Sequence, residues 1–586
     1  MRIRSANTQM VRSLLIAGIL ILSTGGFNRL QAQTPPSDPA QGSAEGENKQ
    51  TRKTGSPDID LTQEPLLKTL TPRATPPMPS TERAGVVADN KLSLTLNAAI
   101  RMALENNNDI EVTRGDVRFA GATLRSLEGV YDPVIRLSPQ FNTSILPNAS
   151  VLGGPSRNAG TVTETSWNEG ASIRKLVGFG GGQYEFFINS GRTTTNSILT
   201  QLSPQYSSEI GIGFTQPLWR NRGIDRYRRD IRVQRKRLDQ SDAEFRRKAI
   251  EIITEVQRAY WELVFARRDH ENRTANLELA HEQFRVIEER VGQGRSAPLE
   301  RAEVETELAT REAELMRAMR DVSIAENNLK QLLLRDASAP EWSALVLPVD
   351  QPNFEDFSIN MEEALKAARE NRPELERLRL EQDVNAVDLR YYKDQTRPRI
   401  DFQSTLSTIG LSGSFVPPSS IFQSRPLPGD YFGGGGRAWG NAFGFDTRSI
   451  TVGVTIELPL RNRTAEGNLA GARFQKDQLQ AATRSIEQAI EIEVRNAVQT
   501  LETARSTVLT ARAARRSAQL QVAGERELYQ NGRSTTFLVF QRENALTNAR
   551  NLEVRAETDY NKAITDLQRA MGTTLRSSNV VVEPVK

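Results

Sequence analysis

The sequence predicts a mainly α-helical fold with a smaller β part, in which long antiparallel coiled-coil hairpins are joined to four amphipathic strands per chain. Three observations predict it: an internal two-fold repeat, apolar residues that recur every seven positions over very long segments, and short segments in which apolar and polar residues alternate. The 586 residues are 38% apolar and 25% charged, which suits long two-faced helices better than several ordinary domains.

The composition excludes several classes of function. The chain has no cysteine, so disulfide frameworks, thiolate metal sites and cysteine nucleophiles are excluded. Two histidines leave little for metal binding or general-base chemistry. The 76 Lys and Arg residues nearly balance the 72 Asp and Glu residues, which argues against a dedicated nucleic-acid binder.

The first residues have the pattern of a targeting segment. Arg2, Arg4 and Arg12 precede the apolar run from Leu14 to Leu22, and small residues follow it. We interpret residues 1–32 as a signal peptide that is removed after export. The alternative, an uncleaved membrane anchor, requires roughly 20 apolar residues in a helix, and this run is much shorter.

The rest of the chain divides into a linker and two similar halves. Residues 33–91 combine many prolines with Ser, Thr, Gly and charged residues, which predicts a disordered linker. Repeat 1 (residues 92–345) and repeat 2 (residues 346–586) share ordered anchors. For example, the motif Gly-Arg-Ser at 294–296 recurs at 532–534, an offset of 238 residues. Each half is expected to run helix, strand, strand, long helix, turn, helix, with a short C-terminal tail after repeat 2.

Each half contains one very long predicted helix. Apolar residues follow a seven-residue lattice from about 225 to 293, and an equivalent segment runs from about 464 to 531. At 1.5 Å per residue, each helix would be roughly 100 Å long, which exceeds any globular core. Leu308, Leu315 and Leu329 continue the same period in the returning helix, so an antiparallel coiled-coil hairpin is predicted.

Four segments show the alternation of a half-buried strand. They begin near Ile135, Ile210, Ile400 and Ile450, and residues 175–189 could add further extended structure. If these strands are transmembrane, their unpaired edges must be closed by strands of other chains, because lipid cannot satisfy backbone N–H and C=O groups. The alternative is an ordinary half-buried sheet in water.

Several motifs, taken in order, are similar to those of a known family. They are Leu94-Thr95-Leu96, Ala99-Ile100, Asn106-Asn107, Gln216-Pro217-Leu218-Trp219, Ala259-Tyr260-Trp261-Glu262-Leu263 and Tyr529-Gln530-Asn531-Gly532. Their order and spacing over about residues 92–575 resemble the TolC family of outer-membrane efflux proteins.

The resemblance implies an architecture and a set of partners. It implies a homotrimer in the cell outer membrane, with a 12-stranded barrel surrounded by outer-membrane lipid and a 12-helix periplasmic tunnel. It also implies docking to a periplasmic adaptor (membrane fusion) protein and to an inner-membrane transporter. The expected function is that of an exit duct for exported substrates, with no covalent chemistry, no enzyme activity, no cofactor or metal and no nucleic-acid partner.

Two sharp turns are the candidate adaptor-docking sites. Their residues are Gly292, Gly294, Arg295, Ser296, Ala297, Gly532, Arg533, Ser534 and Thr535. Glycine permits the left-handed conformation that ends a helix and proline favours the start of the next one, so local structure alone also explains these motifs. The resemblance implies that the turns lie at the inner end of the tunnel and receive the helical hairpins of the adaptor.

The inner mouth departs from the pattern of the family. Family members often carry aspartates just after the second turn, whereas Leu538 and Gln541 occupy those positions here. We therefore expect a constriction of apolar and amide groups rather than an acidic, cation-binding ring. Ordinary helix packing is the alternative explanation of both residues.

Two classes of function remain open. One is the export duct, for which type I protein secretion and small-molecule efflux cannot be separated from the sequence. The other is an exported periplasmic coiled-coil scaffold without pore activity. The strands inserted at matched points of both repeats favour the duct, because a pure coiled coil has no need for them. A glycine-rich segment at 178–182 lacks the Lys and Ser/Thr of a phosphate-binding loop.

Overall fold

The computed structural model describes residues 77–80, 83, 85–147, 160–355, 357, 359–417 and 427–581. All of them belong to one compact unit that spans Thr69–Lys586. The predicted signal peptide and most of the predicted linker lie outside the described residues. Strand β1 (Val87–Leu94) nevertheless begins within the segment interpreted as a linker, because its backbone pairs in parallel with β6 (Ala344–Pro348).

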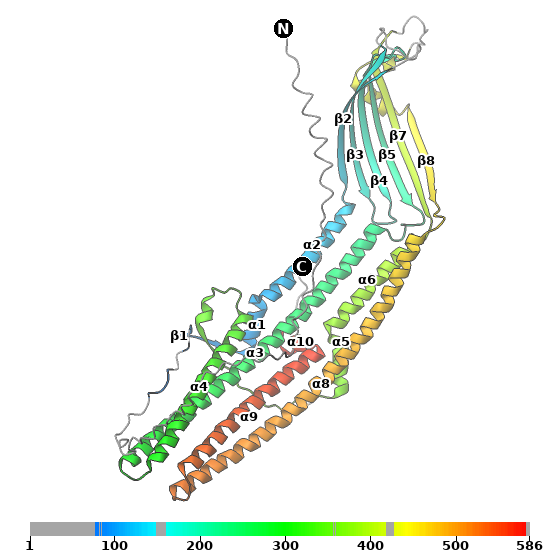
Figure 1. Cartoon of the computed structure of the whole chain (residues 1–586). Helices are drawn as coiled ribbons and strands as arrows, with labels where there is room; N and C mark the ends of the chain where they lie inside the picture. The colour runs from blue at the N-terminus through cyan, green and yellow to red at the C-terminus, as the bar shows by residue number, and fades with distance from the viewer. Residues whose placement is uncertain are drawn as a thin grey trace, which may run out of the picture. The chain divides into compact units, whose positions relative to one another are not determined.

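Helices make up most of the described chain (Figure 1). Both halves contain two shorter helices followed by a long helical hairpin, and the second half has two further short helices. The first half contains α1 (Leu96–Asn106), α2 (Asn108–Glu128), α3 (Arg226–Gly292) and α4 (Pro298–Leu333). The second half contains α5 (Met361–Asn371), α6 (Pro373–Gln395), α7 (Gly435–Phe443), α8 (Arg463–Gln530), α9 (Thr536–Met571) and α10 (Thr574–Ser577). Short 3-10 turns occupy Gly129–Tyr131, Pro340–Ser343 and Gly429–Tyr431. Among the described residues, no helix is both long and apolar enough to cross a bilayer.

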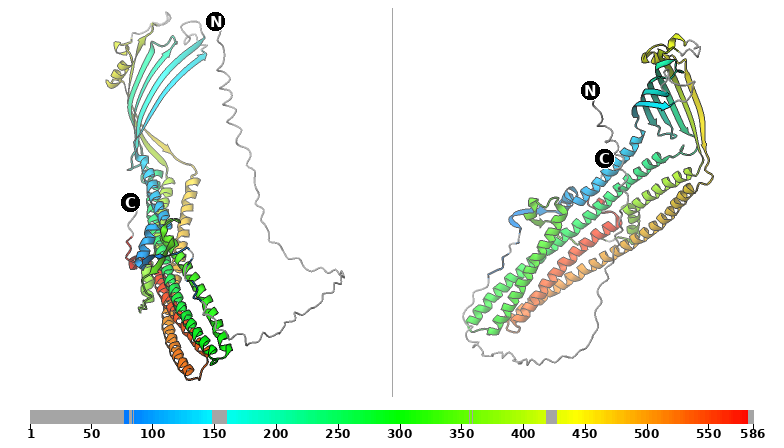
Figure 2. Two further views of the ribbon diagram at one scale, coloured as in Figure 1. Left: turned by 90° about the vertical axis from the view of Figure 1, so that its left-hand side faces the viewer. Right: turned by 45° about the horizontal axis from the view of Figure 1, so that its top comes forward.

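The two longest helices form the predicted hairpins. Helix α3 has 67 residues and α8 has 68, and each packs against the helix that follows it, α4 or α9 (Figures 1 and 2). In the first hairpin, Leu277 and Ala280 of α3 pack with Leu308 and Leu315 of α4. Four apolar side chains removed from water in this way stabilise the hairpin by several kcal/mol, at about 1.5–3 kcal/mol for each large one. The mainly helical class and the long antiparallel hairpins are confirmed.

The sheet is larger than predicted. Its six strands are antiparallel neighbours in the order β2 (Val134–Pro147), β3 (Thr161–Leu176), β4 (Gln183–Thr195), β5 (Leu202–Pro217), β7 (Arg399–Phe415) and β8 (Arg448–Glu457). The prediction of four strands per chain was therefore wrong by one hairpin, β3–β4. The segment noted near 175–189 covers the turn of that hairpin and the first part of β4.

The missed hairpin has a physical explanation. Strand β3 reads Thr-Val-Thr-Glu-Thr-Ser-Trp-Asn-Glu-Gly before its apolar end, so small and polar residues dominate both faces over most of its length. The pairing is set by the backbone ladder with β2 and β4, in which Trp167 lies opposite Phe141 and Arg192. Alternation of apolar side chains is a weak signal in such a strand.

The register divides the sheet into two faces. Residues directly opposite each other in an antiparallel ladder share a face. One face, here called the apolar face, carries exposed Ile135, Leu137, Phe141, Ile145, Trp167, Ile173, Tyr184, Phe186, Ile212, Leu406, Ile450, Val452, Val454 and Ile456. The other face, here called the polar face, includes an ion pair between Arg174 and Glu185 (3.1 Å) and a hydrogen bond from Asn189 to Glu209 (3.0 Å).

Candidate functional site: the paired helical turns

The two turns that connect the long hairpins have the same backbone geometry. Gly294 and Gly532 both adopt φ +69°, a left-handed conformation that favours glycine. The N–H of Arg295 donates to the carbonyl of Arg290, and that of Arg533 to the carbonyl of Leu528, both at 2.8 Å. These bonds satisfy carbonyls at the ends of α3 and α8, as in a Schellman motif.

The next helix begins differently in the two turns. In the first, Ala297 precedes α4 without a side-chain cap, and Pro298 occupies the first helical turn. In the second, the Oγ1 of Thr535 accepts a hydrogen bond from the N–H of Leu538 at 3.4 Å and so caps α9. Ser534 donates a hydrogen bond to Glu525, which holds the turn against the end of α8.

The two turns lie beside each other at the end of the hairpins that points away from the sheet (Figure 1). Arg290, near the end of α3, donates a hydrogen bond of 2.9 Å to the hydroxyl of Tyr529, near the end of α8. Just behind the turns, Phe540 of α9 joins Phe284 and Val304 of the first hairpin in a buried cluster. The structure thus brings both sets of predicted docking residues to the same end of the helical hairpins. Arg295 and Arg533 are exposed there.

Leu538 and Gln541 lie one helical turn apart on α9 and are both exposed. Their neighbours Val539 and Phe540 face the buried side of the same helix. Leu538 is 37% exposed, so both side chains are at least partly available for contacts outside the chain. Their role at an inner constriction stays a prediction.

A buried polar cluster, which was not predicted from the sequence, lies further along the hairpins. Arg311 of α4 is 2% exposed and Glu543 of α9 is 3% exposed. The guanidinium of Arg311 donates to the carbonyl of Asn276 and to Glu307, both at 2.9 Å. Glu543 accepts hydrogen bonds from Gln283 of α3 at 3.1 Å.

This cluster joins the two hairpins. Arg526 of α8 donates to Glu543 at 2.8 Å, so Glu543 is contacted from both α3 and α8. Arg311 and Glu543 thus depart from the solvent-exposed position that is usual for charged residues on long helices. The available signal was Arg311 itself, because it falls between Leu308 and Leu315 on the apolar lattice of α4.

A second titratable group lies near the middle of α3. Burial lowers the pKa of His270 below its ordinary value, and the positive charges of Arg267 and Arg83 act in the same direction. The negative charges of Glu271 and Asp269 oppose this shift without cancelling it. His270 is therefore neutral in the folded chain at neutral pH.

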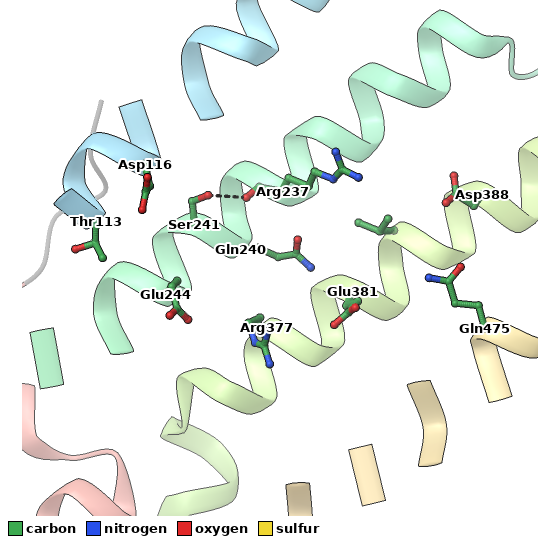
Figure 3. Close-up of a pocket in the computed structure, with 11 residues that line it drawn as sticks. Thr113, Asp116, Arg237, Gln240, Ser241, Glu244, Arg377, Glu381, Asp388 and Gln475 are labelled. Carbon is green, nitrogen blue, oxygen red and sulfur yellow. Dashed lines mark hydrogen bonds between the residues drawn. The ribbon is translucent and has the colours of Figure 1, made fainter. Parts of the chain in front are cut away.

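One hollow between the helices is polar. A space of about 660 Å³ lies between α2, α3 and α6. Side chains of both charges line it, among them Arg237, Glu244, Arg377 and Glu381 (Figure 3). The hydroxyl of Ser241 donates to the carbonyl of Arg237 at 3.1 Å and has no base as its partner. In the described part of the chain, no group of three or more His, Asp or Glu residues could hold a metal ion.

The chain thus combines long hairpins with paired turns at one end and an amphipathic antiparallel sheet at the other. Residues 184–333 and 364–573 match the family model described as outer membrane efflux protein. The chain belongs to the outer membrane efflux protein family. It is an outer-membrane protein with a periplasmic helical extension, as the resemblance implied. No curated protein sequence gives a significant match.

Solved structures share the fold. The CmeC outer membrane channel of Campylobacter jejuni is 16% identical, with a TM-score of 0.56 over 82% of this chain and 86% of that chain. The MtrE outer membrane channel of Neisseria gonorrhoeae, in its open state, is 16% identical, with a TM-score of 0.55 over 86% and 98%. A membrane protein from Pseudomonas aeruginosa is 18% identical, with a TM-score of 0.57 over 84% and 97%.

Proposed function

We propose that the chain forms the outer-membrane exit duct of a tripartite export system, through which substrates pass without covalent chemistry. The observation that carries this proposal is the pairing of the two turns. They repeat one backbone geometry 238 residues apart, lie beside each other through Arg290 and Tyr529, and expose Arg295 and Arg533. Such a surface fits a partner that binds both hairpins at once.

The sheet supports an oligomeric duct. Its outermost strands, β2 and β8, each pair on one side only. Within lipid, every unpaired backbone group costs several kcal/mol, so the edges must meet the edges of other copies. We propose a homotrimer, as the resemblance implied. Three copies of six strands would give eighteen strands in place of the twelve expected from the sequence.

The two faces of the sheet support the same arrangement. A barrel with a water-filled interior turns apolar side chains towards lipid and polar side chains inward. The apolar face therefore suits contact with outer-membrane lipid. The polar face, with the Arg174–Glu185 ion pair and the hydrogen bond between Asn189 and Glu209, suits the lumen. Barrels of 16 to 18 strands are wide enough to leave an aqueous channel.

Two observations indicate the partners. The paired turns offer a docking surface, and the glycine-rich segment at 178–182 lacks the residues of a nucleotide-binding motif, so a partner must supply the energy. We propose that a periplasmic adaptor (membrane fusion) protein docks on the paired turns and that an inner-membrane transporter supplies the energy. Contacts that join the hairpins, Arg290 to Tyr529 and Arg311 to Glu543, would favour a closed inner end at rest, with Leu538 and Gln541 facing the constriction. Adaptor binding would then shift the equilibrium towards the open state.

Bulky substitutions at the turns test the docking role. Gly294→Leu and Gly532→Leu should abolish export, because a leucine side chain is strained at φ +69° and blocks close approach by the adaptor. Gly115→Leu is the matched control, since Gly115 lies within α2, has open space around it and has no positive φ. Normal export by both turn variants, with trimers assembled as in the wild type, would contradict the proposal.

A further inference from the structure

Helix α7 (Gly435–Phe443) has no role in the duct described above. It lies in the connection between β7 and β8, near the end of the sheet that points away from the long helices (Figure 1). It packs on β7 and β5. The hydroxyl of Thr408 donates to the carbonyl of Ala442 at 2.8 Å, and the hydroxyl of Ser412 donates to the carbonyl of Gly434 at 2.9 Å.

These contacts place α7 on the apolar face of the sheet. Thr408 and Ser412 alternate along β7 with the same period as Leu406, which belongs to that face. Between them, Gly410 lies so close to the helix that a Cβ atom there would be 1.8 Å from the carbonyl oxygen of Ala438. Small residues on β7 thus allow the helix to lie directly against the strand, outside the proposed lumen.

The side chains on the apolar face of the sheet are different at the level where α7 packs. The row of paired residues that contains Gly410 also contains Ser208, Ser190 and Glu169 on the same face. Small and polar side chains occupy this row, and the next row away from the long helices carries the aromatic side chains of Phe141, Trp167 and Tyr206 on the same face. Along β7, Phe402 and Gly410 are about 26 Å apart at roughly 3.3 Å per residue. With a strand tilt of about 40°, this is about 20 Å along the barrel axis, close to the height of about 25 Å typical of the lipid-facing band.

Exposed aromatic side chains lie on α7 and next to its two ends. Phe443 is 59% exposed, Phe445 is 56% exposed and Phe432 is 41% exposed. The ring of Trp439 lies 6.0 Å from that of Phe443. Phe445 also adopts φ +58°, a strained conformation for a bulky residue. The N–H of Phe445 donates to the carbonyl of Ala442 at 3.4 Å, so this conformation belongs to the end of α7, and it leaves the side chain exposed.

The charges around α7 indicate which part of the membrane it contacts. Arg437 pairs with Asp430. Asp446 and Arg448, which follow the helix, balance each other in formal charge. The segment therefore lacks the basic excess that attracts anionic headgroups. Aromatic side chains are enriched where hydrocarbon meets the polar headgroups.

We propose that α7 is an interfacial anchor on the outside of the barrel, with Trp439, Phe443 and Phe445 at the boundary between acyl chains and headgroups of the outer leaflet. The occupant of this surface is lipid, and the contact continues the apolar face of the sheet. This inference rests on the proposed function only in that the sheet must span the membrane. We expect the contact between α7 and lipid to be independent of the ionic strength.

A depth measurement by spin labelling tests the proposal. The chain has no cysteine, so single substitutions can be labelled without background in the full protein. The variants Phe443→Cys and Phe445→Cys, reconstituted in vesicles of phosphatidylcholine and phosphatidylglycerol, are compared with two references. Leu137→Cys lies on the apolar face, and Phe179→Cys lies in the β3–β4 turn and is 91% exposed. Collision rates with oxygen and with a water-soluble nickel reagent report the depth of each label.

The labels at 443 and 445 should have a depth between those of the two reference labels. Their nickel access should be at least about threefold below that of the label at 179. Both results should hold at low and high salt. If the labels at 443 and 445 show the same nickel access as the label at 179, the anchor is overturned. If the label at 137 is exposed to lipid in the same experiment, the membrane-spanning sheet still stands. Nickel access at 137 itself would overturn both. As a second arm, Gly410→Val should displace α7 and raise nickel access at 443, and unchanged access would contradict the seating described here.

Discussion

The guanidinium of Arg311 and the carboxylate of Glu543 lie 3.7 Å apart, and both side chains are almost fully buried between the two hairpins. They come from corresponding helices of the two repeats, α4 and α9. A pair of buried charges is retained only if each is satisfied by further polar contacts. Asn276 and Glu307 supply these contacts to Arg311, and Gln283 and Arg526 supply them to Glu543. The two hairpins are thus joined by polar contacts as well as by apolar packing.

Removal of Arg311 should destabilise the helical part strongly. In Arg311→Met, Glu543 loses one of its cationic neighbours while it stays buried, and loss of one partner of such a pair typically costs about 3–5 kcal/mol. Arg320→Met is the control, because Arg320 pairs with Asp321 in an exposed position, where a pair contributes at most about 1 kcal/mol. Thermal unfolding in detergent measures both. Equal midpoints for the two variants would show that the cluster does not stabilise the fold.

Contacts between the turns should keep the inner end closed. The double variant Arg290→Ala/Tyr529→Phe removes the hydrogen bond and the cation–π contact between them. We expect conductance in planar bilayers, without adaptor, to rise severalfold over that of the wild type. Arg285→Ala serves as the control, since Arg285 pairs with Glu282 on the outside of the same helix. High resting conductance of the wild type would contradict a closed resting state.

The inner mouth should not bind cations. If Leu538 and Gln541 face the constriction, the wild-type current should be insensitive to millimolar trivalent cations, because it lacks the ring of carboxylates that such ions need. Leu538→Asp should place carboxylates at three symmetry-related positions, and these should make the current sensitive to block by the cations. A block in the wild type that disappears in Leu538→Ala or Gln541→Ala would show that the assignment is wrong.

His270 should make the helical part sensitive to mild acid. Its pKa is lowered in the folded chain, so the unfolded chain, in which histidine has a pKa near 6.5, binds a proton more readily. The free energy of unfolding therefore falls as the pH drops from 6.5 towards the folded-state pKa, and it recovers as the pH rises. His270→Gln removes this contribution. Between about pH 8 and 5, the unfolding midpoint of the wild type should fall relative to that of His270→Gln as the pH drops, and parallel curves would refute the effect.

The long helices and the turns could be predicted from sequence because their signals are local or periodic. The seven-residue lattice located α3 and α8 to within about two residues, and glycine followed by Arg-Ser marked both turns. The hairpin β3–β4 could not be predicted in the same way. Its pairing depends on the neighbouring strands β2 and β5, whereas its own side chains are mostly small or polar.

The polar cluster around Arg311 was missed for a different reason. A single arginine on an apolar lattice has no partner that the sequence can identify, because Glu543 lies 232 positions away in the other repeat. Only the packing of the first hairpin, α3 and α4, against α9 brings them together. The packing of α7 on the sheet could not be predicted for the same reason. The need for glycine at position 410 is evident only in the folded chain, where Ala438 lies against it.

Crosslinking of the outer strands tests the central claim most directly. Thr451→Cys on β8 is combined in turn with Ser138→Cys, Gln140→Cys or Asn142→Cys on β2, all on the polar face of a chain that has no other cysteine. If identical copies close the sheet, at least one combination should give disulfide-linked species of two and three chains, and none larger, on a denaturing gel. Monomers in every combination, or an internal disulfide within one chain, would contradict a duct enclosed by three copies.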